Sequence, residues 1–242
     1  MPVLRLGIVG CDTSHVVEFS KRLLHRDIAQ EQWVDGATVV AAWPGASAIA
    51  ADRLPGFVAQ LRAYGVRVVD RPEEFLTGGG GCDAVLVEAQ EGGLHRGLAI
   101  PFLEAGMPVF IDKPFACSMA DAAAMVETAA RRGVPLLSAS SLRFAREVTG
   151  LRIGPVLGAH AFAPAALHPR NPGLFHYYAK RLHLRFHAET QAFEAGPVRG
   201  QIMARVVEPE LARDPERKGF GVLIRVRTGS EPFTGRVLTR SA

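Results

Sequence analysis

The sequence predicts an α/β fold in which a doubly wound parallel sheet precedes a second, smaller α+β domain. Apolar, β-rich runs alternate with helical patterns through the first half of the 242-residue chain, and the connections between them are short. One run, 84–89, is apolar almost throughout, as expected of a strand that is covered on both faces. We place the first domain at residues 1–145 and the second at 146–242.

Local patterns predict the elements of the first domain. Apolar residues recur at helical spacing in Val16, Phe19 and Leu23. A later helix is predicted to begin at Ser118, with Asp121 in the position that completes a capping box. In chain order the predicted strands cover 4–9, 37–43, 66–69, 84–89, 108–111 and 135–140, and the predicted helices cover 14–24, 47–64 with an interruption at 55–56, 94–105 and 118–132, with one helical turn at 72–76.

The patterns after residue 141 are weaker. A short helix is predicted at 142–148 and strands at 155–163, 201–207 and 222–227, with a turn and a returning strand at 233–238. We therefore expect a short second domain that contains β-structure.

Composition indicates a globular protein without a membrane span, since 48% of the residues are hydrophobic and 21% are charged. No signal segment precedes the first strand, and the three cysteines lack metal-ligand spacing, so we expect a cytoplasmic protein with reduced thiols. Residues 1–150 carry 14 Lys and Arg against 17 Asp and Glu, whereas residues 151–242 carry 14 against 7. The basic residues of the second half are dispersed and form no basic run, which disfavours nucleic acid as a partner.

The first predicted strand ends in a glycine turn. Gly7 and Gly10 precede polar residues that can start a helix, and such a turn presents N–H groups and a helix dipole to a phosphate. The dinucleotide signature G-x-G-x-x-G is matched only in part, because larger residues occupy the third glycine position. Cys11 lies in this turn. A helix start can lower a thiol's pKa, but a small side chain that fits a tight turn is the favoured interpretation.

Polar residues follow several of the predicted strands at their carboxyl ends. Ligands of open parallel sheets bind at this edge, where the strand order reverses. The polar groups that we expect there are Asp12-Thr13-Ser14-His15, Trp43-Pro44-Gly45, Glu88-Ala89-Gln90 and Asp112-Lys113-Pro114.

The segment Asp112-Lys113-Pro114 is the sharpest chemical signal. Proline fixes its own φ and restricts the residue before it, so the Lys113 ammonium would be held at a strand end and directed into the ligand crevice. A lysine in that place can hydrogen-bond a substrate hydroxyl or take its proton. A surface lysine paired with Asp112 is equally compatible with the tripeptide alone.

Taken together, four stretches resemble the Gfo/Idh/MocA family of NAD(P)-dependent oxidoreductases. They are Gly7-Ile8-Val9-Gly10, the run 84–88 with His95 beyond it, the segment 104–109, and Asp112-Lys113-Pro114, which corresponds to the family's Glu-Lys-Pro. Their order and spacing make the resemblance specific over residues 1–145. The segment 171–177 also resembles one branch of this family.

The resemblance implies a Rossmann domain that binds NAD or NADP, followed by an open-sheet domain that often forms homo-oligomers. It implies hydride transfer between nicotinamide and a hydroxyl-bearing carbon of a small sugar or cyclitol-like substrate, with no membrane partner. Lys113 would sit beside the nicotinamide and the reacting carbon, and His176 is a second acid/base candidate. The implied cofactor-binding residues are Gly7, Gly10, Asp12, Thr13, Ser14 and His15 at the pyrophosphate, Trp43 and Ser47 near the adenosine, and Glu88, Gln90, His95, Asp112, Lys113 and Pro114 along the cofactor cleft.

Three features depart from the family pattern. The glycine signature is incomplete, and Trp43 ends the second strand where an acidic residue would bind the ribose, so NAD and NADP both stay open. Lys180 occupies the position where this branch carries a histidine, and the tail is short for the family's second domain. One hypothesis is a truncated or altered second domain, for example through a changed reading frame. The alternative function is therefore a non-catalytic dinucleotide-binding or scaffold module.

Histidines are frequent in the second half, at positions 160, 168, 176, 183 and 187. A helix would place His183 and His187 on one face, as in a zinc pair. No cysteine lies near them and no Glu follows the first histidine, so we expect no metal site. His176 is kept as an acid/base candidate.

Overall fold

The computed structural model describes residues 2–76 and 81–140, and beyond them residues 144, 156–162, 170, 186–187, 192–193, 221–228 and 237–240. The chain divides into two units, 1–138 and 139–242. The predicted strand at 201–207 and, apart from Phe144, the predicted helix at 142–148 lie outside the described residues. No helix in the described part is both long enough and apolar enough to cross a membrane.

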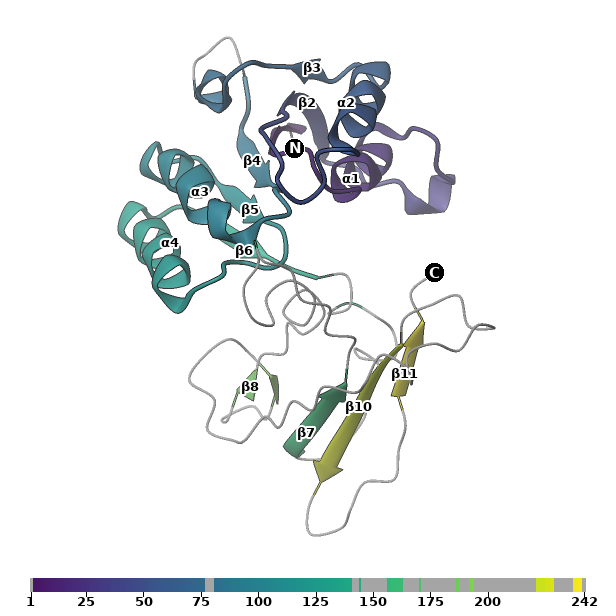
Figure 1. Cartoon of the computed structure of the whole chain (residues 1–242), viewed down its shortest axis with the longest axis vertical. Coiled ribbons are helices and arrows are strands. Elements are labelled where there is room, and N and C mark those ends of the chain that lie inside the picture. Colours follow the sequence, from purple (N-terminus) through teal and green to yellow (C-terminus); the bar gives the residue numbers. More distant parts are fainter. Residues whose placement is uncertain are drawn as a thin grey trace. The chain divides into compact units, whose positions relative to one another are not determined.

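The first unit is built on a six-stranded parallel sheet (Figure 1). Its strands are β1 (Leu4–Val9), β2 (Ala37–Trp43), β3 (Arg67–Val68), β4 (Ala84–Val87), β5 (Val109–Ile111) and β6 (Leu136–Ser138). They lie in the order β3-β2-β1-β4-β5-β6, and every pairing is parallel. This is the doubly wound order, with its switch point between β1 and β4. The predicted fold class is confirmed.

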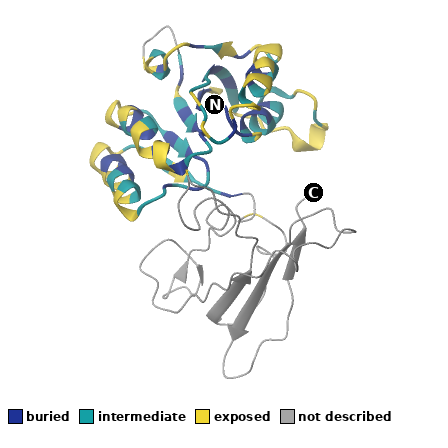
Figure 2. Ribbon diagram, in the orientation of Figure 1, coloured by how far each residue is buried: buried dark blue, intermediate teal, exposed yellow. Residues whose placement is uncertain are grey.

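Helices cover both faces of this sheet. They are α1 (His15–Leu24), α2 (Leu54–Ala63), α3 (His95–Glu104) and α4 (Met119–Arg132), with short 3-10 helices η1 (Gln30–Gln32), η2 (Pro72–Phe75) and η3 (Gly92–Leu94). One apolar core joins Ile8 of β1 to α1 and α2, and a second joins Val9 to α3 and α4. Because neighbouring residues of a strand point to opposite faces, the two cores lie on opposite sides of the sheet. Figure 2 shows the burial concentrated in the strands and on the inner faces of the helices.

Several predicted boundaries were wrong, and the largest error is at the start of α2. The helix predicted at 47–64 begins only at Leu54, because Ser47 holds the preceding residues in turns: its Oγ accepts from the Ala50 N–H at 2.9 Å. Pro55 does not interrupt the helix, since it lies in the first turn, where its missing N–H has no partner to lose. The strand predicted at 84–89 ends at Val87. The N-cap predicted at Ser118 is confirmed, since its side chain accepts from the Asp121 N–H at 3.1 Å. The Asp121 carboxylate in turn accepts from the Ser118 hydroxyl at 2.7 Å, which differs from the reciprocal backbone bond of a capping box.

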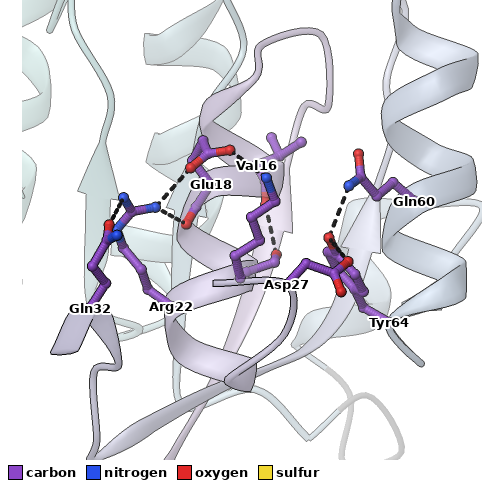
Figure 3. A network of polar contacts seen from close by, with 9 residues as sticks. Val16, Glu18, Arg22, Asp27, Gln32, Gln60 and Tyr64 are labelled. Atoms are coloured by element: carbon purple, nitrogen blue, oxygen red, sulfur yellow. Dashed lines mark hydrogen bonds and ion pairs between the residues drawn. The ribbon is translucent and has the colours of Figure 1, made fainter. Parts of the chain in front are cut away.

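A polar network fixes α1 against its surroundings (Figure 3). Glu18 accepts from Arg22 at 2.8 Å, and Arg22 also donates to Gln32 at 2.9 Å. Beyond the carboxyl end of α1, Asp27 accepts a hydrogen bond from the Tyr64 hydroxyl at 2.8 Å. These contacts connect the last turn of α1 to η1, and the segment after α1 to the end of α2.

The second unit contains antiparallel strands among its described residues. β10 (Gly221–Thr228) pairs with both β7 (Val156–Phe162) and β11 (Val237–Arg240), and β8 (Phe186–His187) pairs with β9 (Ala192–Phe193). The strands predicted at 155–163 and 222–227 are confirmed. Of the returning strand predicted at 233–238, residues 233–236 lie outside the described residues, and β11 covers the two that remain.

Candidate functional site

The turn after β1 requires glycine at Gly10. Its φ is +85°, and a Cβ built there would lie 2.9 Å from the Cα, Cβ and N atoms of Ala89. The N–H groups of Gly10 and Cys11 donate to the carbonyls of Trp43 and Pro44, each at 2.9 Å. The turn therefore packs against the ends of β2 and β4, at the switch point of the sheet, and only a residue without a side chain fits.

Asp12 connects three of the crossover loops. Its Oδ1 accepts from the Gln90 N–H at 2.7 Å, and its Oδ2 accepts from the Ser47 hydroxyl at 2.6 Å. The residue is 3% exposed, and both oxygens bond within the protein. Counted from Gly10, Asp12 takes the place of the second glycine of G-x-G-x-x-G, where the backbone approaches the pyrophosphate. Because its carboxylate is held by the loops, it stiffens this edge of the sheet.

A second cluster lies at the end of β5. His15 Nδ1 lies 2.9 Å from Asp112 Oδ2, and Lys113 Nζ lies 3.6 Å from the same oxygen. The geometry of the His15 contact does not meet the criteria of a hydrogen bond, although the two atoms are close. Burial of Asp112 opposes its ionisation, but the His15 and Lys113 contacts keep the pKa of this carboxyl below its usual value. The sheet thus brings together three predicted residues from α1 and β5.

The amino end of α1 faces the same edge of the sheet. Ser14 is the residue before the helix, and its side chain makes no capping hydrogen bond. Thr13 is buried, and its hydroxyl accepts from the His15 N–H at 3.4 Å. A helix start without a side-chain cap can hold a phosphate through its N–H groups and its dipole.

Cys11 has no reactive environment. It is fully buried, and its thiol lies 3.6 Å from the Trp43 carbonyl, to which it donates. Burial, together with the charges of Glu88 and Asp12, raises the pKa of the thiol. The suggestion that the helix start lowers this pKa was therefore wrong, and the interpretation as a small residue in a tight turn stands.

His95 lies beneath the site. It is fully buried, with Nε2 2.6 Å from the Ala89 carbonyl and Nδ1 3.3 Å from the Phe115 carbonyl. Burial lowers the pKa of the ring although the carbonyl contacts oppose that shift, which favours a neutral imidazole that donates from Nε2. His95 therefore ties the end of β4 to the loop after β5. Ala89 was named in the predicted strand-end group Glu88-Ala89-Gln90, but its carbonyl was not predicted as the partner of His95.

The remaining residues of the predicted site lie in or shortly after strands of the sheet, or outside the described residues. Trp43 is half-buried and its indole N–H donates to the Asp70 carbonyl at 3.1 Å. Gly7 lies in β1, where a Cβ would meet Cys82 Sγ at 2.9 Å. The Lys113–Pro114 peptide bond is cis, and Pro114 lies so close to Gly92 that a Cβ there would meet it at 2.7 Å. His176 and Lys180 lie outside the described residues.

Glu88 carries a buried carboxyl group. The residue is fully buried at the end of β4, and neither of its side-chain oxygens is hydrogen-bonded within the described part of the chain. Burial, reinforced by the charge of Asp112 and opposed by Lys113, raises its pKa well above the usual value. Glu88 therefore keeps its proton to a higher pH in the folded chain than in the unfolded one.

We expect Glu88→Gln to flatten the pH dependence of stability. Because the pKa of Glu88 is raised in the folded state, its contribution to the free energy of unfolding is complete below the ordinary carboxyl pKa. That contribution is lost as pH rises through the raised pKa, by at most about 1.4 kcal/mol per pH unit. The glutamine side chain keeps the shape of the glutamate and cannot ionise. Urea unfolding between about pH 5 and 9 should show a smaller loss of unfolding free energy for the variant than for the natural chain.

The matched control is Glu18→Gln. Hydrogen bonds from Lys21 and Arg22 lower the pKa of the Glu18 carboxyl, so its stabilising contribution is present above the ordinary pKa and is lost toward acid pH. This variant should leave the decline of stability toward alkaline pH unchanged. Parallel curves for Glu88→Gln and the natural chain would contradict the buried-carboxyl interpretation.

Comparison with known proteins identifies the family of this chain. A model described as "Oxidoreductase family, NAD-binding Rossmann fold", named GFO_IDH_MocA, matches residues 4–140. The search of curated proteins found no match.

Several solved structures share the fold. A WlbA dehydrogenase from Bordetella pertussis, in complex with NADH and UDP-GlcNAcA, is 22% identical with a TM-score of 0.52, covering 67% of this chain and 48% of that one. A probable dehydrogenase from Thermotoga maritima is 18% identical with a TM-score of 0.59, covering 99% and 76%. An Agrobacterium radiobacter oxidoreductase in complex with NAD+, L-tartaric acid and magnesium is 19% identical with a TM-score of 0.53, covering 97% and 70%. The chain thus spans about half the length of the Bordetella protein.

Proposed function

Because this chain belongs to the Gfo/Idh/MocA family of oxidoreductases, with its NAD-binding Rossmann domain, we propose that it transfers a hydride between a nicotinamide cofactor and a hydroxyl-bearing carbon of a sugar or cyclitol-like substrate. The observation that carries the proposal is the place of Lys113. It directly follows Asp112 at the carboxyl end of β5, and its side chain is 18% exposed. An ammonium at this edge is within the region where ligands of doubly wound sheets bind.

The residues present fit a dinucleotide. The Gly10 turn brings the backbone to the switch point, and the uncapped start of α1 offers N–H groups to the pyrophosphate. Donors within the protein hold both oxygens of Asp12, so its carboxylate is directed to the neighbouring loops. No acidic residue ends β2, so the proposal includes both NAD and NADP. We propose that the predicted cofactor residues act here, with Glu88 and His95 supporting the loops from below.

The chemistry divides between cofactor and protein. The bound nicotinamide supplies the hydride acceptor or donor. Lys113 orients the substrate hydroxyl through a hydrogen bond, and its neutral amine takes the hydroxyl proton as the C–H bond is oxidised. In the opposite direction the resulting ammonium returns that proton. Asp112, held between His15 and Lys113, positions the ammonium and balances its charge.

The family and the compared structures support the proposed substrate class. The Bordetella structure contains a nucleotide-linked sugar acid, and the Agrobacterium structure contains a hydroxy acid. Both ligands carry hydroxyls on the carbon skeleton, which supports a polyol-like substrate for this chain. His176 is proposed as a second acid/base group.

Cofactor titration tests the proposal. The full chain is titrated with NADH and with NADPH while nicotinamide fluorescence is followed, and is then assayed with NAD+ or NADP+ and a panel of sugars, cyclitols and hydroxy acids. We expect saturable binding of at least one cofactor and turnover with at least one polyol. Binding without turnover would favour the alternative, a non-catalytic dinucleotide-binding module, and absence of binding would contradict both.

A further inference from the structure

His15 stands where the dinucleotide signature has its third glycine. It is the first residue of α1, and its side chain is 32% exposed. Two contacts hold the ring: Asp112 Oδ2 lies 2.9 Å from Nδ1, and the Phe19 ring lies 5.7 Å away between centroids. Within the described residues, no hydrogen bond or ion pair involves Nε2. The imidazole is thus fixed on one edge and available on the other.

Nε2 belongs to the first residue of α1. The first turn has no side-chain cap, so its N–H groups favour an anion at the same place. A dinucleotide that binds there brings two phosphate groups, each with a negative charge. Such an anion strongly favours a neighbouring imidazole in its protonated form, which donates from both nitrogens.

The charged groups around His15 come from several elements. Asp112, at the end of β5, favours the imidazolium, whereas Lys113 contacts the same carboxylate oxygen and opposes it. Glu88, at the end of β4, keeps its proton to higher pH than an ordinary carboxyl, which limits its charge. Asp12 is occupied by Gln90 and Ser47, and one turn along α1 Glu18 is paired with Lys21 and Arg22. The binding of an anion is therefore expected to favour the protonated form of His15 more than any charged group already present.

We propose that His15 is a proton-linked contact for the cofactor pyrophosphate. Its imidazole takes up a proton from solvent when the dinucleotide binds, so Nδ1 faces Asp112 while the Nε2–H donates to a phosphate oxygen. The inference rests on the proposed cofactor site and adds a pH dependence to it. Cofactor affinity therefore rises as pH falls from the alkaline side, and the rise ends where the imidazole already carries its proton without the cofactor.

Calorimetry measures this proton directly. NADH, or NADPH if that is the preferred cofactor, is titrated into the full chain in pairs of buffers with different ionisation enthalpies, from about pH 6 to 8. We expect uptake of a fraction of a proton, approaching one near the alkaline end, and a Kd that weakens by up to about tenfold per pH unit.

Two histidine variants make the test specific. His15→Asn should abolish the proton uptake and leave a Kd that is nearly independent of pH. His25→Asn is the matched control, because His25 lies at the other end of α1, pairs with Asp35 at 3.3 Å and stacks on Trp33 at 4.4 Å. Its substitution should leave both quantities unchanged. A thermal melt of each variant checks that it is folded.

The outcomes are separable. Binding of the cofactor without proton uptake overturns this inference and leaves the proposed function standing. Uptake that persists in His15→Asn but disappears in Glu88→Gln also overturns it, because the proton then belongs to the buried carboxyl. Absence of binding by the natural chain at every pH overturns the proposed function itself, and this inference with it.

Discussion

Replacing Lys113 by alanine is expected to lower kcat by about 10²- to 10⁴-fold while leaving the Kd for the preferred cofactor within a few-fold. The reason is the place of the ammonium at the end of β5, where it would hold the substrate hydroxyl and exchange its proton. The pyrophosphate would be held elsewhere, by the Gly10 turn and the start of α1. The measurement is steady-state turnover beside a fluorescence titration of cofactor binding.

Two further variants define the role of Lys113. Lys113→Arg keeps a positive charge but cannot give up its proton, so it should restore substrate affinity better than it restores kcat. The matched control is Lys21→Ala, because Lys21 is a similarly part-buried lysine that pairs with a carboxylate, Glu18, at 2.8 Å. It should leave kcat unchanged. Equal losses for Lys113→Ala and Lys21→Ala would contradict a chemical role for Lys113.

Replacing Gly10 by alanine is expected to reduce the free energy of unfolding by about 2 to 5 kcal/mol and to abolish cofactor binding. Two effects contribute. A φ of +85° is unfavourable for a residue with a side chain, and the new Cβ would meet the backbone and side chain of Ala89 at 2.9 Å. Relief of this clash would separate β1 from β4 at the point where the pyrophosphate is proposed to bind. Urea unfolding and a cofactor titration measure the two losses.

Gly65 provides a matched control for the backbone conformation. Its φ is +86°, and a Cβ there would meet nothing within 4 Å. Gly65→Ala should therefore cost only the backbone term, about 1 to 2 kcal/mol. Adding Ala89→Gly to Gly10→Ala should recover part of the loss, because one of the contacting atoms is removed while the Ala89 backbone stays. Equal destabilisation by Gly10→Ala and Gly65→Ala would show that the approach to Ala89 is not close.

Elements with strong local signals could be predicted from the sequence. The strand at 37–43 has the predicted bounds, and α4 ends at Arg132 before Gly133, whose φ is +63°, as the glycine stop indicated. The beginning of α2 could not be predicted in this way. It depends on the Ser47 hydroxyl, which bonds Asp12 on a neighbouring loop as well as the turn that follows it.

The candidate site was predictable as a list of residues at strand ends but not as a set of contacts. The pairing of His15 with Asp112 joins residues far apart in the chain, and it depends on α1 crossing toward the end of β5. The burial of Glu88 and His95 likewise depends on how the loops after β4 and β5 close over each other. Strand-end position indicates that a side chain lies at the edge of the sheet, whereas neighbouring elements decide whether it faces solvent.

The most direct test of the account is the position of the nicotinamide ring in a crystal structure of the full chain with its preferred cofactor. The account predicts the pyrophosphate at the start of α1 beside His15, and the ring beyond the ends of β4 and β5 with its reacting carbon facing Lys113 Nζ. A bound dinucleotide whose ring lies away from Lys113, or whose pyrophosphate avoids the Gly10 turn, would contradict it.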